Sequence, residues 1–159
     1  EVDHLVQSYP RRGTFASRVD ITELADITEV RQALEPLAAA KAATLQGGSA
    51  RAGIQATLEA VQQLSGENLR RTLMENDLEV HRLIYQAAGN HHLEQTLIRL
   101  DNLATRIWCM ALDRLPSIDE HIGEHVALLQ AILDGHAQRA QELALEHIVH
   151  FEKSVRSVL

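Results

Sequence analysis

Nine histidines in a chain of 159 residues are the feature of this sequence that most directly suggests chemistry. One of them, His81, follows an aspartate, Asp77, by four positions. On a helix, residues at this spacing share one face, and here the same face also carries Met74, Ile84 and Ala88. The spacing therefore predicts a carboxylate and an imidazole side by side on a face that is otherwise apolar.

Two more histidines lie in the middle of apolar helical stripes. His125 falls within a stripe made of Ile118, Ile122, Leu129 and Ile132. His147 falls within a stripe made of Leu143, Ala144, Ile148, Phe151 and Val155. Burying a carboxylate and three imidazoles is costly unless they are paired or bind something, and one metal ion would satisfy all of them. The predicted ligands are Asp77, His81, His125 and His147.

Imidazole nitrogens and a carboxylate oxygen suit zinc first, with nickel, manganese or cobalt as alternatives. A six-coordinate ion would keep open positions that the carboxylate of a small molecule could fill. Each histidine taken alone is equally an ordinary core histidine, and Asp77 could serve only to orient His81. His121 and His150 lie nearer the edges of their stripes and are alternative ligands.

Three arginines are candidates for contact with such a small molecule. Arg31 lies at the border of an apolar stripe, and its planar fork suits a carboxylate. An ion pair with a nearby glutamate explains that position equally well. Arg99 and Arg106 are possible second contacts, and Trp108 is expected in the core or in a cavity wall.

Helices must position these side chains, because glycines and a proline divide the chain from residue 26 onward into helical segments. The stops are Gly47–Gly48, Gly89, Pro116 and Gly135. Predicted N-caps are Asp26, Ser49, Asn90 and Ser117. Before them, 5–9 and 14–15 resemble short strands around a turn. The sequence predicts an all-α antiparallel bundle of six or seven helices with a short extended N-terminal stub.

Composition narrows the functional classes. The net charge of −7 disfavours DNA binding by this domain itself, because nucleic-acid affinity rests on lysine and arginine. A single cysteine, Cys109, fits a reducing cytoplasm. No apolar stretch approaches the roughly 20 residues that span a bilayer. We therefore expect a cytoplasmic protein that does not interact with a membrane.

Four motifs together resemble the FCD effector domain of GntR-type transcription regulators of the FadR-like subfamily. These are the segment 29–36, the Asp-x-x-x-His and Gly-Asn motifs within 76–90, the segment 124–135, and a histidine 22 positions after His125. The resemblance covers about residues 20–159. Segment 10–15 resembles the wing turn of the family's winged helix-turn-helix, so we expect 1–19 to be the remnant of an upstream DNA-binding head. Val80 and His136 stand where the family usually has Phe and Asp.

The resemblance implies an FCD-like helical bundle, usually a homodimer, that senses a small organic acid, sugar acid or amino acid. It also implies a metal held by one aspartate and three histidines, which match Asp77, His81, His125 and His147. Arg31 matches a residue that commonly faces the effector. Operator DNA would be bound through the upstream head and not through this domain.

Two other functions are compatible with parts of this sequence. A metal-dependent hydrolase would need a general base, and Glu124 and Glu146 each precede a predicted ligand by one residue. At about 100° per residue, we expect both carboxylates to point elsewhere, which argues against an enzyme. A metal-free helical dimerisation module would require the four predicted ligands to form an ordinary polar core.

Overall fold

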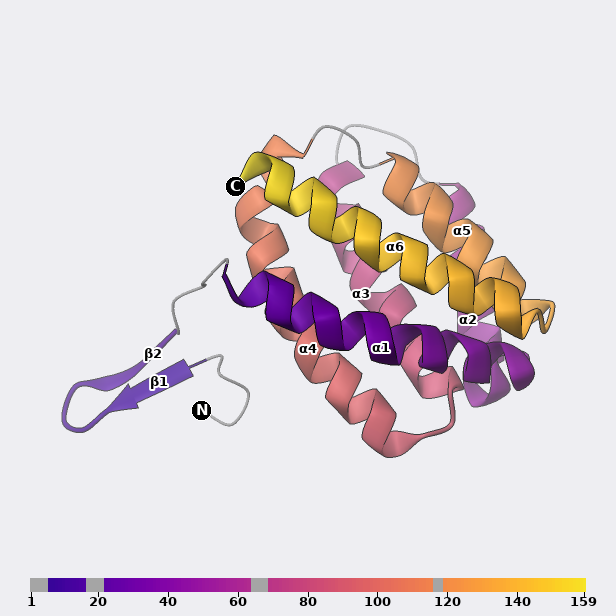
Figure 1. The fold of residues 1–159 in the computed structure, drawn as a ribbon, viewed down its shortest axis with the longest axis horizontal. Coiled ribbons are helices and arrows are strands. Elements are labelled where there is room, and N and C mark those ends of the chain that lie inside the picture. The colour runs from indigo at the N-terminus through magenta and orange to yellow at the C-terminus, as the bar shows by residue number, and fades with distance from the viewer. Residues whose placement is uncertain (1–5, 17–21, 64–68, 116–118) are drawn as a thin grey trace.

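The computed structural model describes residues 6–16, 22–63, 69–115 and 119–159. Within these ranges the chain forms six α-helices and one β-hairpin (Figure 1), which confirms the predicted fold class. Two short 3-10 helices, Gly48–Ala50 and Leu112–Arg114, continue the connections. The α-helices are α1 (Glu23–Thr44), α2 (Arg51–Gln62), α3 (Leu69–Ala87), α4 (His91–Ala111), α5 (Asp119–Leu133) and α6 (Ala137–Val158).

The hairpin consists of β1 (Val6–Tyr9) and β2 (Gly13–Ala16), paired antiparallel so that Tyr9 faces Gly13. The turn is closed by the Arg12 amide, which donates to the Tyr9 carbonyl over 3.0 Å. Gly13 has a φ of 100°, a conformation that glycine adopts without steric cost. The two short extended pieces predicted around a turn are thus confirmed.

Several helix ends follow the predicted signals. The Asn90 side chain accepts a hydrogen bond of 3.2 Å from the Leu93 amide, so Asn90 caps α4 as predicted. Gly47 and Gly135 follow α1 and α5 with φ of 85° and 78°. The Gly47 amide bonds the Ala42 carbonyl over 2.9 Å, which satisfies one of the last carbonyls of α1.

The structure does not show the other three predicted N-caps as expected. α1 begins at Glu23, so placing its start at Asp26 was wrong. Leu24 is fully buried, and burial of this side chain accounts for the extra turn. Ser49 lies inside the 3-10 helix, and α2 begins only at Arg51. Ser117 lies outside the described residues.

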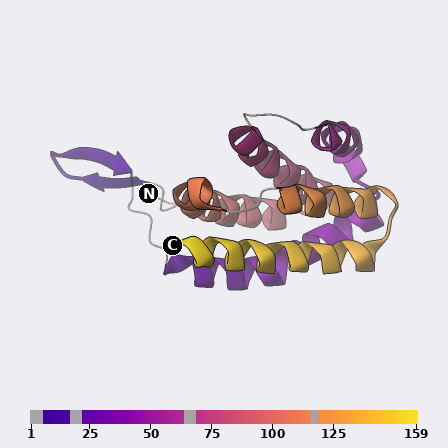
Figure 2. The same cartoon turned by 90° about the horizontal axis from the view of Figure 1, so that it is seen from above.

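The helices pack in layers. α1 and α6 run antiparallel side by side and form one layer, with α4 and α5 next to it and α2 beyond (Figures 1 and 2). α3 packs against α2 and α4 and also contacts α1. Within the described ranges, none of the helices combines the length and apolar character needed to cross a membrane.

Two apolar clusters form the core. The larger cluster contains residues from all six helices, for example Ala38, Val80, Leu97, Leu129 and Ala144. The smaller contains Leu24, Ile27, Ala104, Trp108 and Phe151. Along α1, α4 and α6, buried polar and charged residues lie between the two clusters and form a polar layer within the interior. The residues of this layer on those three helices are Arg31, Glu35, Asp101 and His147.

Candidate metal centre and adjoining cavity

The four predicted ligands meet in this polar layer. α3 supplies Asp77 and His81, α5 supplies His125 and α6 supplies His147. Their side chains are buried, with residue exposures of 2–5%. One donor atom from each lies within 4.8 Å of every other. Sequence periodicity placed each residue on an inward face, and the packing of three helices brings these faces together.

The spacing of the donor atoms fits a metal ion. The His147 Nε2 atom lies 3.3 Å from Nε2 of both His81 and His125. The Asp77 Oδ1 atom lies 3.3 Å from His125 Nε2 and 3.7 Å from His81 Nε2. Bonds of 2.0–2.1 Å to a tetrahedral or octahedral ion separate adjacent donors by roughly 2.8–3.4 Å. The nitrogen and oxygen donors are therefore compatible with a divalent ion.

The outward nitrogens of two imidazoles are held by acids. The Nδ1 atom of His81 lies 3.2 Å from both the Glu35 carboxylate and the Tyr85 hydroxyl. The Nδ1 atom of His147 lies 2.9 Å from Glu124 Oε2. A carboxylate partner on one ring nitrogen fixes the ring and leaves the other nitrogen to bind a metal. Both Nε2 lone pairs are thus directed toward the centre.

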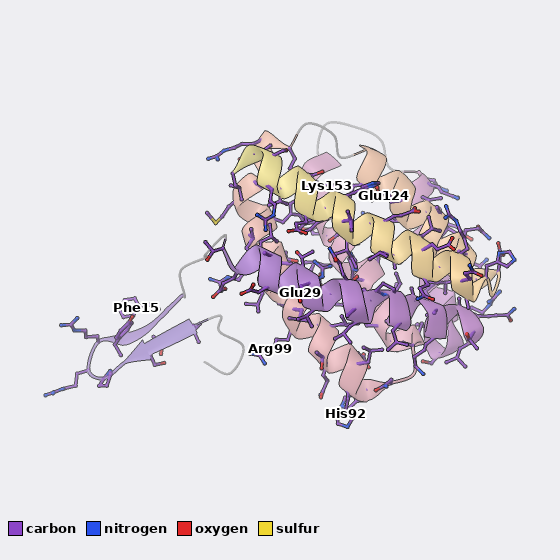
Figure 3. The ribbon with its side chains drawn as sticks, in the orientation of Figure 1. Phe15, Glu29, His92, Arg99, Glu124 and Lys153 are labelled. Atoms are coloured by element: carbon purple, nitrogen blue, oxygen red, sulfur yellow. The ribbon has the colours of Figure 1, made fainter. Side chains whose placement is uncertain are left out.

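Glu124 corrects one expectation from the sequence. Its carboxylate was expected to point away from the ligands, yet it lies between α5 and α6 and contacts His147 (Figure 3). The rotation of about 100° per residue does separate Glu124 from His125 on α5, but it says nothing about contacts with α6, where His147 lies. Glu146 is exposed and lies 3.9 Å from Arg139, as expected for a residue outside the site.

Burial and neighbouring charges set the protonation of these groups. Burial and nearby imidazoles hold the pKa values of His125 and His147 well below the ordinary range, so both rings are neutral. Burial alone would also lower the pKa of His81, but Glu35 and Asp77 raise it to about 9. Burial opposes ionisation of Asp77, yet His81 and His121 keep its pKa well below the usual value.

His121 is the strongest alternative ligand. Its Nε2 atom lies 2.7 Å from Asp77 Oδ1, and its side chain is 17% exposed. Together with Glu124 and His147 it forms a second group of convergent donors. His150 is exposed and contacts Glu124 Oε1 at 2.5 Å. The described chain therefore places His121 beside the four-residue centre and His150 at its margin.

A small cavity of about 10 Å³ adjoins the centre, enough for about one water molecule. Three of the four predicted ligands, Asp77, His81 and His147, line it, and Arg31 and Asp101 line it as well. Trp108 and Phe151 contribute apolar walls, as anticipated for Trp108.

Arg31 is buried in this layer, at 4% exposure. Its Nε atom lies 2.5 Å from Glu35 Oε1, so the ion pair considered from the sequence is formed, but in the interior. Its Nη2 atom lies 3.6 Å from Asp101 Oδ1. Arg99 is exposed (Figure 3) and Arg106 is half-buried, and neither lines the cavity.

Asp101 and Glu35 were not identified from the sequence. Asp101 is 2% exposed, and its Oδ2 atom has no hydrogen-bond partner. Burial raises its pKa to about 6, although His81 and Arg31 oppose the shift. A signal was available for both residues: Asp101 lies on the stripe between Leu97 and Ala104, and Glu35 follows Arg31 by one turn.

The fold and the site together describe a helical bundle with a buried cluster of one aspartate and three histidines. Residues 26–150 match the FCD domain model, so the chain belongs to the FCD family, the C-terminal domain of GntR regulators of the FadR-like group. FCD domains are typical of regulators that are not enzymes. No curated protein matches this chain.

Proposed function

We propose that this domain senses a small carboxylate effector beside a divalent metal held by Asp77, His81, His125 and His147. The observation that carries the proposal is the convergence of four buried donor atoms, all within 4.8 Å of one another, from three helices. Family membership supports the regulatory role. When bound, the ion supplies a positive charge that attracts a carboxylate.

The charge of the polar layer also favours a divalent ion. Among the described residues, the buried acids are Glu35, Asp77 and Asp101, and the buried guanidinium is Arg31. A ligating imidazole must be neutral, so the ion displaces the proton that Glu35 and Asp77 hold on His81 in the metal-free protein. Three carboxylates and one guanidinium then leave a net charge of −2 for the ion to balance. Uncompensated buried charge is costly, and one divalent cation cancels it. Zinc is the ion best suited to three imidazoles and a carboxylate, with nickel or manganese as alternatives.

Arg31 contributes to the same site, because its guanidinium lines the cavity together with three of the proposed ligands. An effector acts as a switch only if it binds one arrangement of the bundle better than another. α1 carries Arg31 and follows the N-terminal hairpin in the chain. We therefore propose that α1 transmits the change toward an upstream DNA-binding head in a cytoplasmic, homodimeric regulator.

Metal content measured by mass spectrometry on tag-free protein tests this proposal. We expect about one divalent ion per chain, lost in His81→Ala and in His147→Ala. His91→Ala and His136→Ala are matched controls, since both histidines are exposed, and they should keep the ion. A parent protein that takes up neither zinc nor nickel would refute the metal site and leave a metal-free dimerisation module.

A further inference from the structure

Asp101 carries a buried oxygen without a partner. Among the described residues, Oδ2 of Asp101 is the buried side-chain polar atom for which the structure has no hydrogen-bond partner. The residue lies on α4 between buried apolar positions, with Leu97 one turn before it and Ala104 after it. A carboxylate at such a position is costly unless something donates to it.

The Arg31 guanidinium does not satisfy this oxygen. Arg31 approaches the other oxygen, Oδ1, at 3.6 Å, which is longer than a hydrogen bond. The guanidinium is drawn instead to Glu35, with Nε 2.5 Å from Oε1. Asp101 lines the cavity that the proposed metal ligands also line, so a molecule that enters there can reach this side chain.

The net charge of the buried groups restricts the chemical class of the molecule that can enter the cavity. A divalent ion brings the buried groups to neutrality, as described for the polar layer. An effector with only a carboxylate would add an uncompensated negative charge beside Asp101. An effector that also carries an ammonium group would add no net charge and would place its donor where an acceptor is unpaired.

We propose that the effector is an amino acid, whose carboxylate lies on the metal side of the cavity and whose ammonium group donates to Asp101. This inference rests on the proposed function for its metal and carboxylate half. The cavity of about 10 Å³ holds about one water, so binding requires the lining side chains to separate, Trp108 and Phe151 being the largest. Effector binding is thereby coupled to a change in helix packing.

The test uses the metal-loaded chain and the twenty standard L-amino acids, screened by thermal shift and followed by calorimetry. The best binder is then compared with two analogues in which hydrogen or hydroxyl replaces the ammonium group. We expect the amino acid to bind at least tenfold more tightly than either analogue. Asp101→Asn should reduce this preference at least tenfold while keeping about one metal ion per chain. Asp113→Asn, at an exposed acid, is the control that should change nothing.

Three results would overturn the assignment: no amino acid stabilises the metal-loaded protein, an analogue binds as tightly as the amino acid, or Asp101→Asn keeps the preference. Failure of the proposed function is separate, because it appears in the metal content of the parent. If the parent holds no metal, the same screen is run on the metal-free chain. Amino-acid binding that is lost in Asp101→Asn then still supports the role of Asp101, and absence of binding overturns it.

Discussion

The Nε2 atoms of His81 and His147 lie 3.3 Å apart, although the two residues are separated by 66 positions in the chain. His125 approaches the same nitrogen of His147 at the same distance. A proton shared between Nε2 of His81 and Nε2 of His147 serves only that pair, and Nε2 of His125 then depends on Asp77 Oδ1 at 3.3 Å. A metal ion between them would satisfy all three at once.

We therefore expect chelation to destabilise the fold. An ion present at 100 to 1,000 times its dissociation constant stabilises by about 3–4 kcal/mol, so its removal should lower the melting temperature by roughly 5–15 °C. The measurement is calorimetry with and without a chelator, followed by re-addition of zinc. Unchanged melting after verified removal of the metal would contradict the prediction.

The two neighbouring histidines of α5 should differ in their effect on metal binding. His125 is 3% exposed and its Nε2 atom lies near both Asp77 and His147, whereas the side chain of His121 is 17% exposed. His125→Ala should lose the ion, and His121→Ala should retain about one ion per chain. Metal content of the two purified variants decides between them. The opposite pattern would make His121 the ligand.

Glu124 should act as a positioning residue for His147. Removing a carboxylate that orients a ligating imidazole typically weakens metal affinity by 10–100-fold without abolishing it. We expect this loss in Glu124→Ala, measured by zinc competition with a chromophoric chelator. Glu146→Ala is the matched control, since Glu146 also precedes a ligand but is exposed. Equal affinity in the two variants would show that the 2.9 Å contact of Glu124 has no such role.

Asp101 should make the stability of the metal-free protein depend on pH. Its folded-state pKa of about 6 is above the ordinary value of 3.8, so ionisation costs stability. The cost is absent below the ordinary value, grows as pH rises and is complete above about 6. Relative to the parent, Asp101→Asn should gain about 2 kcal/mol between pH 4.5 and 7.5, measured by urea unfolding.

The same measurement on Asp113→Asn provides the baseline, because Asp113 is exposed and does not line the cavity. A difference between Asp101→Asn and the parent that does not change with pH would show that Asp101 ionises normally in the folded protein.

Much of the fold was predictable because its signals are local. Glycines at 47 and 135 end helices where the backbone needs a positive φ, and Asn90 caps α4 through its own side chain. The start of α1 was predicted wrongly because it depends on packing between distant parts of the chain. A local capping pattern at Asp26 was overridden by burial of Leu24, which depends on helices far away in the sequence.

The inward-facing side chains could be predicted from the amino-acid sequence, because helical periodicity fixes directions around a single helix. Asp77 and His81 had to share a face, and His125 and His147 had to lie within apolar stripes. The contacts between individual atoms, by contrast, depend on how the helices pack. Three features depend on how one helix is rotated and shifted against another. They are the contact of Glu124 with His147, the contact of His121 with Asp77, and the unpaired oxygen of Asp101. Packing of side chains from several helices sets that register, and no periodicity within one helix contains it.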